Sequence, residues 1–383
     1  MLDLERRGHE LVLGSMYPPK TPVRHEYLAR LRAQVHYAPE KPALEKLVRR
    51  ARREGRWPEA LIAEHERKYG AEYKAALRAR NALFFVELFE RENIRHFHVH
   101  FANRAAHTAL FVKAISGIPF SVTAHGQDFM IDLGNEELLR EICATAEFVA
   151  AETNYSRDLL AGRCPAATDK IFRVYNGMSV AKFAPSAASR NATGPIRLLS
   201  VGRLVAFKGF DVLIDACAEL RRQSIDFVCE IIGDGPLRDE LQARVAKNDL
   251  ATNVRFRGEQ SQENVLASLA ACNIFVLASM TDERGASDVF PTVIAEAMAS
   301  GKPVVSTTIA GIPELVSHGE TGLLVAPEDA KALADAIARL IRDDTLQASF
   351  GRAGRLRIEN NFTIEKTIEP LLERFSRTPA AMV

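Results

Sequence analysis

The chain has 383 residues, more than one hydrophobic core usually holds, so we expect two domains of somewhat under 200 residues each. Its 47% hydrophobic and 26% charged residues are ordinary for a soluble globular protein and argue against a disordered, collagen-like or coiled-coil chain. No apolar run reaches 18 residues, and the first ten residues are too charged for a signal peptide, so we expect a cytoplasmic protein.

Charge is unevenly distributed along the chain, although the net charge is only +1. Residues 1–190 hold 29 Lys and Arg against 23 Asp and Glu, while the remaining residues hold 21 against 26. The basic stretch KLVRRARREGRW at 46–57 would suit the acidic inner surface of a membrane, and a solvated helix face explains it equally well. Nucleic-acid binding is disfavoured, because no known module and no interleaved aromatic residues accompany the charge. The five cysteines lack C-x-x-C spacing, which indicates reduced thiols rather than a disulfide framework or a zinc site.

The amino half is expected to be an α/β domain. Its first segment, LDLERRGHE, is typical of the end of a helix, and a strand follows at 10–15. Because a doubly wound domain normally opens with a strand, we expect its first strand and turn to be missing, unless the domain simply has one strand fewer. Helical segments fill much of 41–93. Further strands are expected at 96–102, 119–126, 148–153 and 171–177.

The carboxyl half alternates short apolar runs with longer amphipathic stretches, which predicts a parallel sheet covered by helices on both faces. The Pro-, Ser- and Ala-rich segment at 181–195 is the expected linker. We therefore place domains at 1–180 and 196–360 and a final helix and tail at 361–383. Strands are expected at 196–202, 226–233, 253–258, 273–279 and 303–307, and helices at 209–223, 236–247, 262–271, 291–300, 328–341, 343–357 and 363–376.

The first candidate site is the stretch SVGRLVAFKGF, where a buried strand ends at Gly202. Arg203 and Lys208 follow before the next helix, at the edge of the sheet where open α/β folds bind ligands. Two cations there suit a diphosphate, since Arg offers a fork of donors and Lys a point charge. A pair of solvated surface cations is the alternative, and the spacing favours neither.

The second candidate is the turn Gly-Asp-Gly-Pro at 233–236, between a strand and a helix. Gly233 and Gly235 would let a ligand approach the backbone, and Pro236 suits the first turn of a helix. Such a turn is more often a plain connector than a ligand site.

The third candidate is a pair of acids, Asp288 and Glu296, in an otherwise small and apolar stretch. We expect a helix with Pro291 at its first position and Thr292, Glu296 and Ser300 on one stripe. Burying Glu296 would cost several kcal/mol unless hydrogen-bond donors satisfy it. A ribose diol could supply two donors, and an arginine partner is the structural alternative.

The fourth candidate is His125, which follows a strand in the amino half and precedes a glycine. A lone histidine is usually structural, but this edge of a sheet is a common place for a ligand. His96, His98 and His100 alternate along one strand and resemble a metal site only superficially, because no acid or cysteine lies nearby in sequence. A D-x-D pair for a divalent metal on a nucleotide diphosphate is also missing, so we expect no metal and no other cofactor.

Taken together, these motifs resemble the retaining nucleotide-sugar glycosyltransferases of the fourth sequence family, over nearly the whole chain. The matching motifs are G-R-x4-K from Gly202 to Lys208, the Gly-Asp-Gly-Pro turn, the acids Asp288 and Glu296 with seven residues between them, TAHG around His125, and the NG pair at 176–177. The segments HVHFA and GIPFSVTAH are similar to those of bacterial exopolysaccharide and lipopolysaccharide enzymes. The resemblance implies the GT-B fold, in which two Rossmann-like domains with parallel sheets face each other and the last helix crosses back to the first domain.

The resemblance also implies roles for individual residues. Arg203 and Lys208 would hold the diphosphate and stabilise it as it leaves, and Glu296 would bind the ribose. Asp288 would bind hydroxyls of the donor sugar, and His125 would approach that sugar from the other domain. This chain departs from the family's usual pattern by having Asp288 where most members have Glu and Val289 where most have Gly. The implied donor-binding residues are completed by Gly202, Gly233, Gly235, Arg257, Gly258, Phe290, Pro291 and Thr292, and the implied acceptor side comprises His100 and Asn103.

The function that the resemblance implies is transfer of a sugar from a UDP- or GDP-linked donor to a glycan or lipid-linked acceptor, with retention of configuration, in cell-surface polysaccharide biosynthesis. Contact with the inner face of the membrane would be peripheral. Two alternatives differ in class: a nucleotide-sugar-binding subunit without turnover, and a sugar-nucleotide epimerase or phosphorylase on the same architecture. The G-R-x4-K motif with its acid-x7-acid partner favours transfer over epimerisation. A phosphorylase would need a longer chain.

Overall fold

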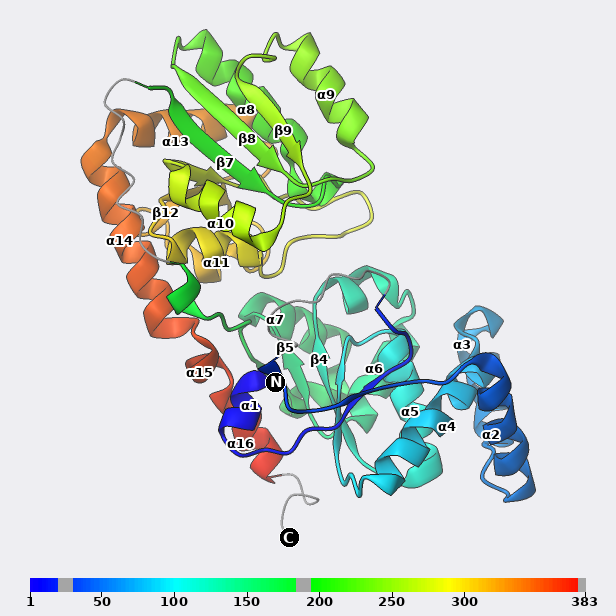
Figure 1. The fold of residues 1–383 in the computed structure, drawn as a ribbon. Helices are drawn as coiled ribbons and strands as arrows, with labels where there is room; N and C mark the ends of the chain where they lie inside the picture. The colour runs from blue at the N-terminus through cyan, green and yellow to red at the C-terminus, as the bar shows by residue number, and fades with distance from the viewer. Residues whose placement is uncertain (20–29, 184–193, 378–383) are drawn as a thin grey trace. The chain divides into compact units, whose positions relative to one another are not determined.

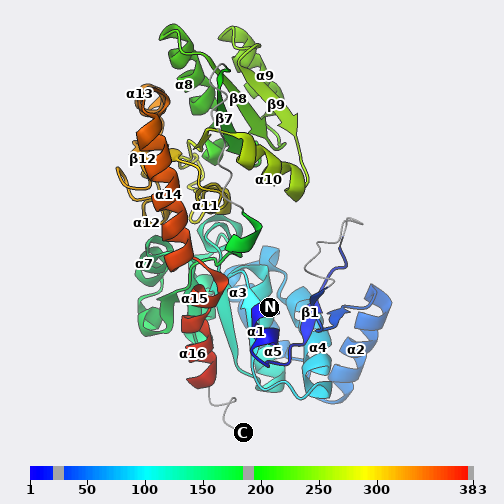
Figure 2. The same cartoon turned by 60° about the vertical axis from the view of Figure 1, so that its left-hand side comes forward.

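The computed structural model describes residues 1–19, 30–183 and 194–377. They form two compact units, each with its own parallel sheet (Figures 1 and 2). The first unit comprises Met1–Ala151, Arg157–Arg173 and Glu369–Val383, and the second comprises Glu152–Ser156 and Val174–Ile368. Most of the expected linker, at 184–193, lies outside the described residues.

The first unit is built on a four-stranded parallel sheet in the order β3-β4-β5-β6. Its strands match the four expected there and are shorter by three or four residues, because the flanking positions lie outside the paired registers. The central strand β4 is buried at every position, as expected for a strand with helices on both faces. The elements are β3 (Phe97–His100), β4 (Phe120–Ala124), β5 (Val149–Ala151), β6 (Ile171–Arg173), α4 (Ala75–Arg91), α5 (Arg104–Ser116), α6 (Glu136–Thr145) and α7 (Asn154–Arg163).

The amino-terminal segment forms a small parallel pair of strands of its own. The helix α1 (Leu2–Arg6) and the strand β1 (Leu13–Ser15) confirm the expected order of helix and strand. β1 pairs with β2 (Val35–Tyr37), a strand that the sequence did not predict. Gly14 allows β1 to pack on α4, since a Cβ there would lie 2.9 Å from the ring of Phe85. Helices α2 (Lys41–Arg53) and α3 (Glu59–Tyr69) follow and account for the helical region expected before β3.

The second unit contains a six-stranded parallel sheet in the order β12-β11-β10-β7-β8-β9. The strand order reverses between β7 and β10, and such a switch point is where doubly wound sheets bind ligands. β12 was not predicted from the sequence. The elements are β7 (Ile196–Val201), β8 (Phe227–Ile232), β9 (Val254–Gly258), β10 (Ile274–Val276), β11 (Val304–Thr307), β12 (Gly322–Val325), α8 (Phe210–Arg222), α9 (Arg238–Lys247), α10 (Gln262–Ala271), α11 (Thr292–Ala299), α12 (Ile312–Leu315), α13 (Ala330–Arg342) and α14 (Asp344–Asn361).

The last helix that the structure describes belongs to the first unit, as the sequence analysis expected. Instead of one helix at 363–376 there are two, α15 (Ile364–Thr367) and α16 (Glu369–Arg377). The break precedes Pro370, which has no N–H for the helix ladder and would clash with the preceding turn. α16 packs on the first unit through Phe375, whose ring contacts Phe148, and through an ion pair of 2.8 Å between Arg7 and Glu369.

The second unit also holds the beginning of α7. Both oxygens of the Glu314 carboxylate accept backbone N–H groups there, Oε2 from Asn154 and Oε1 from Tyr155, each at 2.8 Å. The hydroxyl of Tyr175 donates to the same carboxylate at 2.8 Å. Glu314 therefore satisfies N–H groups that a helix start leaves unpaired. In the part of the chain that the structure describes, no helix is both long and apolar enough to cross a membrane.

Candidate functional site

Three loops at the carboxyl ends of β7, β8 and β9 pack directly on one another, backbone against backbone. The N–H of Gly202 donates to Ile232 at 2.9 Å, and the N–H of Gly233 donates to Gly258 at 2.9 Å. A Cβ on Gly233 would lie 1.9 Å from the carbonyl oxygen of Gly202, and a Cβ on Gly235 would lie 2.5 Å from that of Leu204. The glycines of the Gly-Asp-Gly-Pro turn are thus required for the contact between loops. Their use by a ligand stays a prediction.

Lys208 and Asp288 meet across the switch point, although 80 residues separate them in sequence. The loop after β7 reaches this point because Gly209 has a φ of +63° and presses against Ala278, where a Cβ would lie 1.9 Å from the carbonyl oxygen. Lys208 Nζ lies 2.7 Å from Asp288 Oδ1, and both side chains are largely buried. The structure therefore brings together two residues that the sequence analysis assigned to one site.

Asp288 has a second partner that the sequence analysis missed. Ser279 Oγ donates to Asp288 Oδ2 at 2.6 Å, and the carbonyl of Ser279 accepts from Thr307 Oγ1 at 2.5 Å. Both oxygens of Asp288 are therefore engaged by protein groups. The expected contact between Asp288 and sugar hydroxyls would require one of these bonds to be exchanged. Ser279 could have been noticed as the polar residue that closes the apolar strand expected at 273–279.

Glu296 stands in contrast to Asp288. It lies within α11, half-buried, and no side-chain or backbone donor contacts its carboxylate among the described residues. Burial alone raises the pKa of Glu296 to about 7. The arginine partner that would explain it as a structural residue is absent from the part of the chain that the structure describes.

The start of α11 differs in one detail from the expectation. The helix begins at Thr292, and Pro291 is its N-cap with a ψ of 100°, so the prediction that Pro291 occupies the first helical position was wrong by one residue. The proline has an extended ψ because it leads the chain into the helix from outside. No side chain of the described residues caps this N-terminus. Phe290, just before it, is buried against Tyr175 and Phe362, so its ring is part of the core.

The remaining donor-side candidates lie at the same edge of the sheet. The side chain of Arg203 is exposed and has no hydrogen-bond or ion-pair partner within the described ranges. Arg257, at the end of β9, lies 3.7 Å from Glu230 and is about half exposed (54%). Gly258, which follows it, has a φ of +68°.

In the first unit, His100 and His125 come together at the carboxyl ends of β3 and β4. His100 Nδ1 lies 3.1 Å from His125 Nε2. Asp128, which the sequence analysis missed, fixes the loop by accepting the backbone N–H groups of His125 at 3.0 Å and Phe129 at 2.9 Å. Its position three residues after His125 is that of a capping acid. Asn103 caps α5 by accepting the N–H of Ala105 at 3.1 Å, so the oxygen of this acceptor-side candidate already has a structural partner.

His98 of β3 and His96, just before that strand, have structural partners. His98 lies 2.7 Å from the hydroxyls of both Ser121 and Thr123, and His96 lies 2.8 Å from that of Ser121. Burial lowers the pKa of His96 to about 4 and that of His98 well below its usual value, so both rings are neutral. Their alternation along the strand places them against these hydroxyls and the ring of Phe148.

Comparison with known proteins identifies the family. Residues 184–357 match the family described as "Glycosyl transferases group 1", and residues 3–182 match "Glycosyltransferase Family 4". The amylovoran biosynthesis glycosyltransferase AmsK of Erwinia amylovora is 30% identical over 330 residues, which cover 84% of this chain and 78% of that protein. The chain belongs to the family 4 glycosyltransferases.

One further relative and one solved structure are also similar to this family 4 glycosyltransferase. WcaL of Escherichia coli (strain K12), a glycosyltransferase named for colanic acid biosynthesis, is 35% identical over 225 residues, which cover 56% of this chain but only 55% of that protein. The crystal structure of Anabaena Alr3699/HepE in complex with UDP-glucose is 22% identical and superposes with a TM-score of 0.68, covering 78% of this chain and 82% of that chain. The likeness confirms the expected GT-B fold.

Proposed function

We propose that this glycosyltransferase moves a sugar from a nucleotide-diphosphate donor, UDP- or GDP-linked, to a glycan or lipid-linked acceptor in cell-surface polysaccharide biosynthesis. Transfer would proceed with retention of configuration and without a metal ion. The observation that carries the donor half of the proposal is the half-buried carboxylate of Glu296, which has no partner among the described residues. The acceptor class is suggested by the names of two relatives, which refer to colanic acid and amylovoran.

Glu296 is assigned to the ribose of the donor. A carboxylate removed from water without hydrogen-bond donors is destabilised by several kcal/mol, and its raised pKa of about 7 reflects that cost. The two hydroxyls of a ribose diol would supply the donors that the described protein groups do not. The same diol is present in UDP and GDP, so this contact does not select the base. UDP is supported as the nucleotide by the HepE complex, which contains UDP-glucose.

Arg203, Lys208 and the uncapped start of α11 are assigned to the diphosphate. The negative charge that develops on the leaving diphosphate would be neutralised by the two side chains and by the helix N-terminus. Asp288 then has a positioning role, because it fixes the ammonium group of Lys208 at 2.7 Å. The acceptor hydroxyl would attack the anomeric carbon on the face from which the diphosphate leaves, as the family's retention implies. Catalysis would consist mainly of positioning and charge stabilisation.

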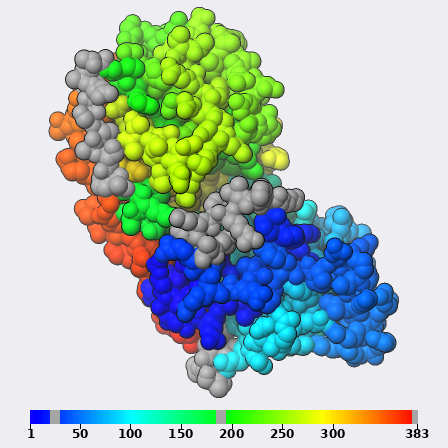
Figure 3. Space-filling view, viewed as in Figure 1, coloured from blue at the N-terminus to red at the C-terminus, as the bar shows by residue number. Residues whose placement is uncertain are grey.

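His125, His100 and Asn103 are assigned to the acceptor side in the first unit. Contact with an acidic membrane surface is proposed for α2, whose exposed basic residues include Lys46, Arg49 and Arg53. Figure 3 shows this part of the chain, in blue, at the surface of the first unit.

The test is a screen of UDP- and GDP-linked sugars for binding and for hydrolysis or transfer by the whole chain. Glu296→Ala and Lys208→Ala should each reduce turnover by at least about a hundredfold, while Glu283→Gln, an exposed acid of the same unit, should leave it unchanged. Undiminished turnover in both site variants would exclude this assignment. Binding of a nucleotide sugar without hydrolysis, and without transfer to any acceptor, would instead support a binding subunit. Isomerisation of the sugar without transfer would support an epimerase.

A further inference from the structure

Arg78 and Arg104, both in the first unit, have no acidic partner among the residues that the structure describes. Arg78 lies in the second turn of α4, and Arg104 is the first residue of α5. The two helices pack along each other (Figures 1 and 2). Neither guanidinium has a hydrogen-bond or ion-pair partner among residues 1–19, 30–183 and 194–377.

Arg78 is the more constrained of the two. Its Nε is fully buried and has no hydrogen-bond partner within the described chain. Burial lowers the pKa of Arg78, and the positive charge of the nearby Arg104 lowers it further. A buried N–H donor without an acceptor is destabilising, and two neighbouring cations without a counter-ion add to that cost. Such a pair is explained if an anion completes it.

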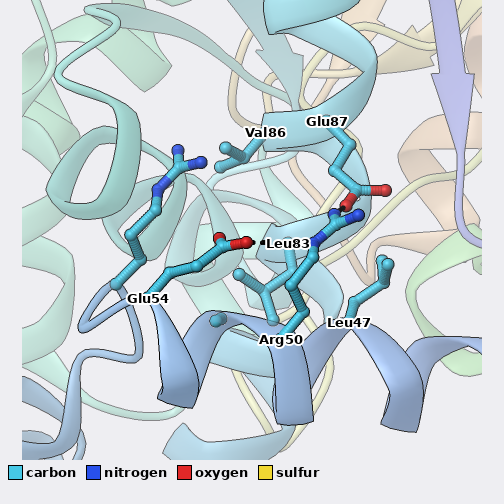
Figure 4. Close-up of a pocket in the computed structure, with 8 residues that line it drawn as sticks. Leu47, Arg50, Glu54, Leu83, Val86 and Glu87 are labelled. Atoms are coloured by element: carbon cyan, nitrogen blue, oxygen red, sulfur yellow. Dashed lines mark ion pairs between the residues drawn. The ribbon is translucent and has the colours of Figure 1, made fainter.

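The neighbouring arginines show that this surface does not lack acids. Arg50 pairs with both Glu54 and Glu87 in the shallow pocket between α2 and α4, as Figure 4 shows. Arg56 likewise pairs with Glu90. Arg50 and Arg56 are therefore paired within the protein. Arg78 differs from the exposed arginines of α2 because its unpaired Nε is buried and a second cation, Arg104, is nearby.

The position of Arg104 connects the pair to the acceptor side. It opens α5 directly after the loop that carries Phe101, and the positive end of the α5 dipole lies at the same place. Phe101 has a φ of +78°, which is costly for a bulky residue, and yet the residue is 48% exposed. The ring lies 4.7 Å from that of His125, between centroids. Strain of this kind gathers at functional sites, and an exposed aromatic face beside imidazoles is suited to contact with a sugar ring.

We propose that Arg78 and Arg104 bind an acidic group of the acceptor, a phosphate or a carboxylate, beside the aromatic surface of Phe101. This inference rests on the proposed function, since it assigns the chemical class of that function's acceptor. An arginine fork binds either group through two parallel N–H···O bonds, and two arginines together suit a diphosphate. The acidic group has two possible sources: the phosphates of a lipid linker and the carboxylate of an acidic sugar.

The experiment measures binding of four probes to the whole chain by isothermal titration or ligand-observed NMR, with saturating UDP present to occupy the donor site. Inorganic pyrophosphate represents the first source and glucuronic acid the second, while glucose and glycerol are neutral controls. Arg104→Gln and Arg78→Gln should each weaken binding of at least one acidic probe by about tenfold or more. Arg91→Gln, at the far end of α4 and paired with Glu92, should leave that binding unchanged.

The outcomes separate this inference from the proposed function. Acid binding that persists in Glu296→Ala but is lost in Arg104→Gln assigns the probe to the first unit, whether or not a donor is ever turned over. Arg104 is exposed, so its variant is expected to keep the fold, which a thermal melt checks. The inference is overturned if neither acidic probe binds to the wild type, or if both arginine variants bind the acids as the wild type does. Equal binding of acidic and neutral probes would also overturn it.

Discussion

The pH dependence of stability in Glu296→Gln tests the site more directly than any assay of activity. In the folded chain the pKa of Glu296 is raised to about 7 from an ordinary value of 4.5. The folded state therefore holds a proton that the unfolded state releases between these two values, so stability falls as pH rises from about 4.5 to about 7. With about 1.4 kcal/mol for each pKa unit, the loss at pH 8 amounts to about 3 kcal/mol.

A neutral glutamine has the shape of the acid and does not titrate, so Glu296→Gln should remove this dependence. Urea unfolding at pH 5 and pH 8 measures it, with Glu283→Gln as the exposed control. At pH 8 the Glu296→Gln variant should be more stable than the wild type by about 3 kcal/mol, and at pH 5 most of that difference should be gone. A difference between variant and wild type that is the same at both pH values would refute the reasoning.

The same titration predicts how the donor binds. If ribose hydroxyls donate to the ionised carboxylate, UDP-glucose should bind the wild type about tenfold more weakly at pH 6 than at pH 8, because its affinity follows the ionised fraction. Glu296→Gln should show a weaker but pH-independent affinity. UDP-glucose is a better probe than UDP for this measurement, because its phosphodiester groups do not titrate near neutral pH. A wild-type affinity that does not change with pH would contradict a contact between Glu296 and the ribose.

Three further substitutions test the geometry around the strand ends. Ser279→Ala removes the hydrogen bond of 2.6 Å to Asp288 and should cost about 1–3 kcal/mol in urea unfolding, with Ser279→Thr as the partial rescue. Gly233→Ala places a Cβ 1.9 Å from the carbonyl of Gly202 and should lower the yield of folded protein sharply, whereas no loss of thermal stability would show that the two loops can separate. Glu314→Gln replaces one of the two accepting oxygens by an amide NH2 group, so the N–H groups of Asn154 and Tyr155 no longer have one oxygen each. Hydrogen exchange at the start of α7 should therefore increase, and unchanged protection there would show that the cap is dispensable.

The sequence predicted the sheets well because buried parallel strands are continuous apolar runs. β12 escaped prediction because its four residues, Gly322–Val325, lie too close to the preceding short helix for a separate strand to stand out. β2 escaped prediction because Val35–Tyr37 is only partly buried and because three residues are too few to show the alternation of a strand. The single helix expected near the carboxyl end breaks before Pro370, a position where proline could have signalled the boundary.

The candidate site was predictable as a set of residues, and its internal pairing was not. Glycine and charge after a strand mark the ligand edge of a parallel sheet, which is why Gly202 and Lys208 were candidates. Glu296 was a candidate because an acid in an apolar helix needs a partner. The ion pair between Lys208 and Asp288 depends on the loop in which Gly209 packs against Ala278. A contact between residues 80 positions apart leaves no signal in the local sequence. Arg78 gave no signal either, because an arginine in a helix is usually a solvated cation.

The return of α16 to the first unit has a consequence for how the protein is made. Phe148 belongs to the core of a unit whose strands are all complete by residue 173, yet one of its covering rings, Phe375, follows the whole second unit in the chain. During translation that apolar surface would stay uncovered while the whole of the second unit emerges, at a rate of about 5–20 residues per second. The first unit is thus the earlier to collapse and the later to finish, and a ribosome stalled within the second unit would leave an aggregation-prone nascent chain.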